Sequence, residues 1–173
     1  MGSRLVLVRH AKSDYPWGVD DHDRPLNDRG RRDAPEIGAW LDAHVTWPAD
    51  AVPAVRVSTA RRAQTTWGLA RTRMSDRWDD VDLADEPRIY EADVTSLLDV
   101  VGECVAPTLL LVGHNPGLAE LVAGLAVDDA LRAEALVKFP TSAIAVLESD
   151  LPLAEAVQGG DTFHVTAFAV PRG

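Results

Sequence analysis

The sequence predicts an α/β protein in which helices pack against a mainly parallel central sheet. Segments rich in aliphatic and β-branched residues recur at strand length, and stretches with helical spacing separate most of them. This alternation is typical of layered α/β folds. The last two strand segments are joined by a shorter connection, so we expect an antiparallel pairing there.

Five segments are expected to form strands. The first, RLVLV, runs directly into Arg9 and His10. The last alternates between apolar and polar residues and follows a Gly-Gly turn signal. The expected strands cover residues 4–8, 54–58, 108–112, 143–149 and 163–170.

Four helices are expected between these strands. The first has one apolar stripe, formed by Ala34, Ile37, Leu41 and Val45. The last begins at Asn115-Pro116, because asparagine is a common N-cap and proline is common at the first helical position. The expected helices cover residues 28–45, 60–75, 94–105 and a segment from Asn115 onward.

The remaining segments are expected to be loops within a single domain that spans residues 1–173. A chain of this length has room for one domain with a substantial core, and nothing in it marks a boundary. The expected loops cover residues 14–27, 46–53 and 150–161.

The formal net charge of −10 argues against two classes of partner. Nucleic acids and anionic membranes normally bind to a basic surface, so we expect neither as a partner. The first residues lack the apolar run of a signal peptide, and no apolar segment is long enough to span a membrane. Cys104 is the only cysteine, which excludes an intrachain disulfide. We therefore expect a cytoplasmic protein.

Cation-forming side chains follow three of the expected strands. The first strand leads to Arg9 and His10, the second leads through Ser58 to Arg61 and Arg62, and the third leads to His114. In open α/β sheets, ligands bind beyond the carboxyl ends of the strands. Arginine and free helix N–H groups both suit phosphate oxygens, so we expect a phosphoryl-binding pocket there.

The two histidines suggest covalent chemistry in that pocket. A neutral imidazole can attack phosphorus and form a phosphohistidine, which divides one difficult displacement into two easier ones. Neighbouring cations are expected to lower the pKa of the attacking imidazole and keep it neutral near pH 7. The second histidine and the arginines would then stabilise the charge on the phosphoryl oxygens.

Several motifs together resemble one known family. RHAKS, DRPLNDRGRRDA, STARRAQTT, LLVGHNPGL and KFPTSAIAVLE occur in this order between Leu5 and about Glu148. They resemble the histidine phosphatase superfamily, and specifically its SixA-type phosphohistidine phosphatase branch. The resemblance implies a three-layer α/β/α fold like that of phosphoglycerate mutase, with no metal and no cofactor.

The resemblance also implies roles for individual residues. His10 would be the nucleophile with Arg9 beside it, Arg62 matches the S-x-x-x-R-A pattern that begins at Ser58, and His114 matches the second histidine of GHNPG. Larger members have an acidic proton donor after the third strand, and this chain has no unmistakable counterpart. Glu91 is our candidate for that role, and Glu86 is the second choice.

The weak signal for a proton donor bears on the substrate. An alkyl phosphate must expel an alkoxide, whereas a phosphorylated imidazole leaves as a neutral ring once its other nitrogen is protonated. The larger relatives use insertions to cap the site, and this short chain lacks room for them. Both points favour a phosphohistidine substrate, carried on a protein.

Other polar residues near these motifs have weaker assignments. Ser13 and Asn115 are candidates to donate hydrogen bonds to phosphate, although Asn115 is equally well explained as an N-cap. Arg61 should point about 100° away from Arg62 around the helix and face solvent. The acidic cluster at residues 20–23 lacks the spacing of a metal site, so we expect a solvated loop at the pocket rim, in which Arg24 pairs with a carboxylate.

Three functions therefore remain open. The leading hypothesis is a metal-independent phosphatase for phosphohistidine that releases inorganic phosphate through an intermediate on His10. The nearest alternative is a phosphatase for small esters such as sugar phosphates or nucleotides, which would use Glu91 as well. A third hypothesis, of another class, is a non-catalytic phosphate-binding regulatory module.

Overall fold

The computed structural model describes residues 2–173, within which six strands form one sheet in the order β3-β2-β4-β1-β5-β6. The strands are β1 (Ser3–Arg9), β2 (Ala54–Val57), β3 (Asp82–Asp85), β4 (Thr108–Gly113), β5 (Ile144–Ser149) and β6 (His164–Ala169). The four strands β1, β2, β3 and β4 are parallel to one another, whereas β5 is antiparallel to both of its neighbours, β1 and β6. The mainly parallel sheet and its antiparallel end are therefore confirmed.

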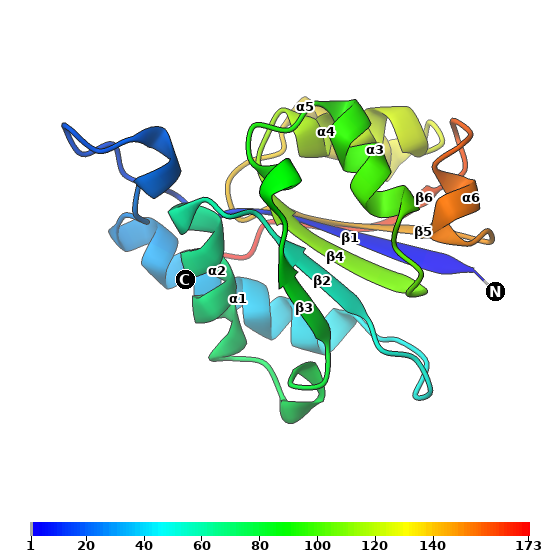
Figure 1. Cartoon of the computed structure of the whole chain (residues 1–173), viewed down its shortest axis with the longest axis horizontal. Helices are drawn as coiled ribbons and strands as arrows, with labels where there is room; N and C mark the ends of the chain where they lie inside the picture. The colour runs from blue at the N-terminus through cyan, green and yellow to red at the C-terminus, as the bar shows by residue number, and fades with distance from the viewer. Residues whose placement is uncertain (1) are drawn as a thin grey trace.

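Helices cover both faces of this sheet (Figure 1). The helices are α1 (Asp28–His44), α2 (Arg61–Arg71), α3 (Val94–Gly102), α4 (Gly117–Leu125), α5 (Ala130–Val137) and α6 (Leu153–Ala156). Short 3₁₀ turns are η1 (Asp21–Asp23), η2 (Asp76–Trp78) and η3 (Pro87–Ile89). α1 and α2 lie on one face, and α3 to α6 lie on the other (Figure 1). The three-layer α/β/α arrangement is as expected.

The alternation of side chains along β1 explains why its sequence is an uninterrupted apolar run. Leu5 and Leu7 pack into the core under α3 to α6, and Val6 and Val8 pack into the core under α1 and α2. Each of these side chains is almost completely buried. The part of a strand that is covered on both faces needs apolar residues at every position, and β1 has them from Leu5 to Val8.

Most expected elements lie close to their predicted positions. The five predicted strands correspond to β1, β2, β4, β5 and β6, and the stripe on α1 is buried as expected. The helix expected over residues 60–75 is shorter, because α2 ends at Arg71 and a turn follows.

Three elements were missed, and one helix start was wrong. β3 and α5 were not predicted, and α6 lies inside the segment expected to be a loop at 150–161. The residues of β3 are mostly exposed, so it lacks the apolar pattern of a buried strand. α4 begins at Gly117, and Asn115 is not its N-cap, because its side-chain amide instead donates to the Phe139 carbonyl.

A close backbone contact holds the start of α1 against the segment that follows β1. Asn27 caps α1 by accepting a hydrogen bond from Gly30 N at 2.9 Å. A Cβ atom at Gly30 would lie 2.1 Å from the Lys12 carbonyl oxygen, so only glycine fits there. This contact fixes the backbone two residues beyond His10.

Within residues 2–173, no helix combines the length and the apolar character that spanning a bilayer requires.

Candidate active site

Side chains from three parallel strands meet in a cavity of about 650 Å³ at the carboxyl ends of those strands. Arg9 is the last residue of β1 and His10 follows it, the segment after β2 contributes Arg62, and the segment after β4 contributes His114. β4 lies between β1 and β2, so the topology brings these distant motifs together. The cavity lining also includes Ser13, Tyr15, Asp21, Arg24, Glu91 and Asn115.

His10 is held rigidly where β1 ends. Its backbone N–H donates to the Gly113 carbonyl at 3.0 Å, and its carbonyl accepts from Ser142 N at 3.2 Å. Its ring Nδ1 lies 2.7 Å from the Ala11 carbonyl, which can only accept, so Nδ1 carries the proton. A neutral His10 therefore has its lone pair on Nε2.

The pKa of His10 is lowered to about 3, mainly because burial disfavours the charged ring. The side chain is only 6% exposed. His114, Arg62 and Arg9 lower the pKa further. The expected direction is therefore found, but the principal cause is burial and not the neighbouring cations.

His114 lies next to His10, with 5.0 Å between the ring centroids. Its Nε2 is 2.7 Å from Ser58 Oγ, and its Nδ1 is buried without a partner among the described residues. Burial lowers its pKa to about 3, with a further contribution from the charge of Arg62. A serine hydroxyl that donates to Nε2 would leave Nδ1–H as a free donor.

Two arginines in the cavity retain unused donors. Arg9 donates through Nη1 to the Phe139 carbonyl at 2.6 Å, and Arg62 donates through Nη1 and Nη2 to Asp21. The Nε atoms of both arginines are buried without a hydrogen-bond partner in residues 2–173. Leaving buried donors unpaired is costly, so this arrangement suits a ligand that brings acceptor oxygens.

Within residues 2–173, three of the other predicted site residues line the cavity, and Glu86 does not. Ser13 and Asn115 both line the cavity, but Ser13 Oγ already accepts from Arg24 Nη1 at 2.7 Å. Glu91 lines the cavity from an exposed position with φ 52°. Glu86 instead binds the guanidinium of Arg88 and is absent from the cavity wall as described over residues 2–173.

The loop at residues 14–27 contributes more than the sequence indicated. Arg24 pairs with a carboxylate as expected, at 2.8 Å from Asp21, and Arg61 is exposed as expected. The sequence predicts only a solvated rim for Asp21, yet its carboxylate also binds Arg62 and Tyr90. Ser58 begins the S-x-x-x-R-A pattern, but no local pattern indicates that Ser58 and Tyr90 both contact His114.

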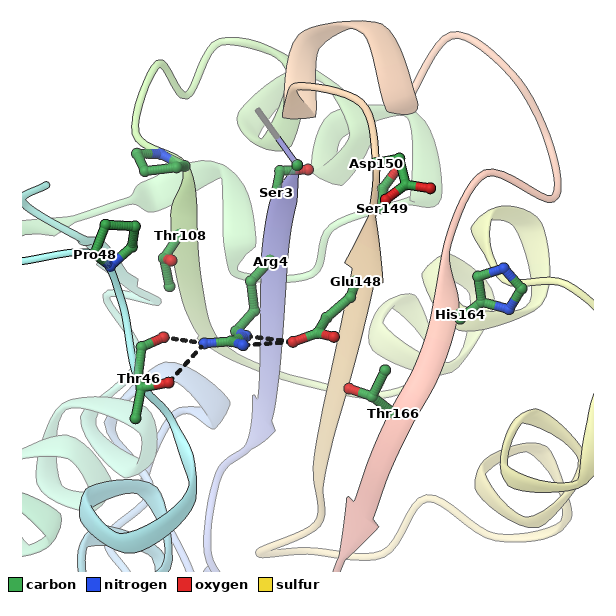
Figure 2. A pocket seen from close by; sticks show the side chains of 12 residues that line it. Ser3, Arg4, Thr46, Pro48, Thr108, Glu148, Ser149, Asp150, His164 and Thr166 are labelled. Atoms are coloured by element: carbon green, nitrogen blue, oxygen red, sulfur yellow. Dashed lines mark hydrogen bonds and ion pairs between the residues drawn. The ribbon is translucent and has the colours of Figure 1, made fainter.

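A second cavity, of about 520 Å³, lies at the opposite end of the sheet (Figure 2). The side chain of Arg4 lies between Thr46 and Glu148 there and bonds to both (Figure 2). His164 lies on β6, apart from this cluster (Figure 2). The arginine of this cavity is paired with Glu148, whereas Arg9 in the cavity at His10 binds no carboxylate among residues 2–173, so the second cavity is the poorer anion site.

Across residues 2–173, no three histidine, cysteine, aspartate or glutamate side chains are grouped so that they could hold a metal ion.

Known proteins resemble this chain in sequence and in fold. Residues 5–97 match the sequence profile of the histidine phosphatase superfamily, branch 1. The uncharacterised protein Rv1276c of Mycobacterium tuberculosis is 45% identical over 172 residues, which cover 95% of this chain and all of that protein.

Two solved structures share the whole architecture. A protein assigned as phosphohistidine phosphatase SixA from Nakamurella multipartitia superposes with a TM-score of 0.82 at 28% identity, covering 99% of this chain and 97% of its own. A second, assigned in the same way, from Agrobacterium tumefaciens, has a TM-score of 0.78 at 25% identity and covers 98% of both chains. The expected fold and the resemblance to SixA-type proteins are confirmed.

Proposed function

Because the chain belongs to the histidine phosphatase superfamily, we propose that it is a phosphatase that hydrolyses phosphohistidine on proteins through a phosphoryl group transferred to His10. The observation that carries this proposal is the pairing of a neutral, buried His10 with His114 and two arginines in one cavity. The similarity to SixA-type structures supports the choice of substrate.

In the first step, His10 Nε2 attacks the phosphorus of the substrate. A new N–P bond forms at His10 while the N–P bond of the substrate breaks, and the substrate imidazole leaves as a neutral ring because its other nitrogen is protonated. The unused Nε–H donors of Arg9 and Arg62 would bind the equatorial oxygens, as would His114 Nδ1–H. These donors are fixed in advance, so they need little reorganisation.

In the second step, water attacks the phosphorylated His10. The His10 N–P bond breaks, the lone pair returns to Nε2, and inorganic phosphate leaves with the oxygen of the water. Glu91 at the cavity wall would take up the proton of the attacking water. No metal or cofactor has a part in either step.

The same site suits a small phosphate ester, and one observation favours that alternative. Glu91 lies on the cavity wall, where a protonated carboxyl could supply the proton that an alkoxide leaving group needs. Turnover of a carrier protein phosphorylated on histidine should be compared with turnover of a panel of sugar phosphates, nucleotides and aryl phosphates. A large preference for the esters would overturn the proposed substrate.

The covalent intermediate gives the direct test. The protein is mixed briefly with the phosphorylated carrier, and the acid-labile phosphoryl group is mapped by mass spectrometry at neutral to alkaline pH. We expect modification at His10, loss of the adduct in His10→Ala, and retention in His164→Ala, which lies at the opposite end of the sheet. Absence of both adduct and turnover with every donor would favour a phosphate-binding module instead.

A further inference from the structure

Asp21 forms the centre of a hydrogen-bond network that reaches Arg62. Its backbone carbonyl accepts from Arg62 Nη1 at 2.6 Å, and its Oδ2 accepts from Arg62 Nη2 at 3.0 Å. Oδ2 also accepts from the Tyr90 hydroxyl at 3.0 Å, and Oδ1 accepts from Arg24 Nε at 2.8 Å. Asp21, in η1, thereby contacts Arg62 in α2, Tyr90 after η3, and Arg24 in the same loop.

The network fixes Asp21 from the side of β1 as well. Arg24 is only 10% exposed at its side chain, and it also donates to Ser13 Oγ and to the Asp14 carbonyl. The ring of Tyr15 lies 4.0 Å from its guanidinium carbon. Arg24 therefore has little freedom to move, and Asp21 is held between two immobilised side chains.

The position of Asp21 decides which edge of Arg62 remains available. Both terminal nitrogens of Arg62 bind Asp21, while Nε is buried without a partner within residues 2–173. The Arg62 side chain is 6% exposed, so it cannot turn easily toward solvent. A guanidinium has five N–H donors in one plane, and binding along one side leaves the Nε side for phosphate oxygens.

We propose that Asp21 is a positioning residue, which orients the Arg62 guanidinium so that its Nε edge faces the transferred phosphoryl group. This inference rests on the proposed phosphatase function and adds a residue to it. It requires a carboxylate at position 21, because an amide has one acceptor atom and would turn its NH₂ group toward Arg24, Tyr90 or Arg62.

The opposite role would follow from the same contacts if Asp21 competed with the phosphoryl group for Arg62. A carboxylate that occupied the phosphate position would weaken phosphate binding, and its removal would strengthen it. The two roles therefore predict effects of opposite sign on the affinity for inorganic phosphate.

The test compares Asp21→Asn with Asp20→Asn. The second variant removes the same charge at the preceding position. The Asp20 side chain makes no capping hydrogen bond to η1, so its variant controls for loss of one negative charge near the site. We expect Asp21→Asn to lower kcat with the phosphorylated carrier by about 10- to 100-fold, because small misplacement of a phosphate-binding group has large effects. Inhibition by inorganic phosphate should weaken, and Asp20→Asn should keep wild-type values.

A double-variant experiment separates positioning from a general effect on folding. In an Arg62→Ala background, Asp21→Asn should have little further effect on kcat, because the group that it orients is gone. Tyr90→Phe removes one donor to Asp21 and should cause a smaller loss in the same direction. Melting temperatures and circular dichroism of all variants show whether they fold.

Three results would overturn the inference: tighter phosphate binding in Asp21→Asn, equal activity of Asp21→Asn and Asp20→Asn, or fully additive losses with Arg62→Ala. Each of these is distinct from a failure of the proposed function, which would appear as a wild-type protein that forms no adduct on His10. If the wild type is active and Asp21→Asn has no effect, the proposed phosphatase function stands and only the positioning role of Asp21 is excluded.

Discussion

The ring centroids of His10 and His114 lie 5.0 Å apart and the rings are tilted by 54°, although 103 residues lie between the two histidines in the chain. They are neighbours because β1 and β4 pair in parallel and in register, with Arg9 opposite Gly113. Each histidine follows immediately after that last pair. Two matched strand ends therefore place the two imidazoles around a volume suited to one phosphoryl group.

His114→Gln should slow turnover without preventing transfer to His10. The glutamine amide reaches the position of Nε2 beside Ser58 and leaves no donor at the position of Nδ1. Loss of a donor to the developing charge typically costs about 10²- to 10³-fold in rate, and we expect a fall in kcat of that size. Stopped-flow or quenched-flow measurement of adduct formation on His10 should show the same decrease. A variant with wild-type kcat would contradict the assigned role of His114, and His164→Gln serves as the control for a histidine replacement far from the cavity.

Stability should fall as the pH is lowered below about 6.5. The pKa values of His10 and His114 are about 3 in the folded protein, against an ordinary value of 6.5. Between these values the unfolded chain binds protons that the folded protein does not, so the free energy of unfolding decreases as the pH falls. Each imidazole should contribute roughly 1–2 kcal/mol to the loss between pH 7.5 and pH 5.

Urea denaturation at pH 7.5 and pH 5 measures that loss. The double variant His10→Gln/His114→Gln should lose less stability than the wild type over the same interval, because neither glutamine titrates. An equal loss in both proteins would contradict the buried, neutral state of the two rings.

Glu91→Gln should affect two classes of substrate differently. An alkyl phosphate depends on a proton donor for its leaving group, so its turnover should fall by about 10²-fold or more. Turnover of phosphohistidine should fall less, because it uses Glu91 only in the hydrolysis of phosphorylated His10, whereas an alkyl phosphate also uses it to protonate the leaving group. Glu86→Gln is the matched control, since Glu86 is bound to Arg88 away from the cavity wall as described over residues 2–173. Equal losses on both substrates would contradict this division of roles.

Trp17→Ala should discriminate between a protein substrate and a small one. Trp17 is fully exposed on the loop that leads to Tyr15 at the cavity, and this loop projects from the body of the molecule (Figure 1). A carrier protein bound at the cavity would contact the loop, so its KM should rise by about 5- to 10-fold, in line with the loss of an exposed aromatic contact. The KM for free phosphohistidine should stay constant, and a parallel rise for both would contradict the prediction.

Local patterns were sufficient for the parts of the fold that are buried on both sides. The apolar run before Arg9 and the run before His114 predicted β1 and β4, because strands inside a layered sheet need apolar residues throughout. β3 was missed because it is an exposed edge strand that begins with Asp82 and ends with Asp85. α6 was missed because a helix of four residues is too short to show a helical period.

The sequence was enough to predict the layered architecture and a shared location for Arg9, His10, Arg62 and His114, since parallel strands end at the same edge of a sheet. The contacts that tune these side chains follow from the folded structure alone. Two examples are the contact of Ser58 with His114 and the contacts of Asp21 with Arg24 and Arg62. Both depend on how segments that are distant along the chain pack against one another. Hydrogen bonds between segments distant along the chain follow no local periodicity, so they appear only once the chain is folded.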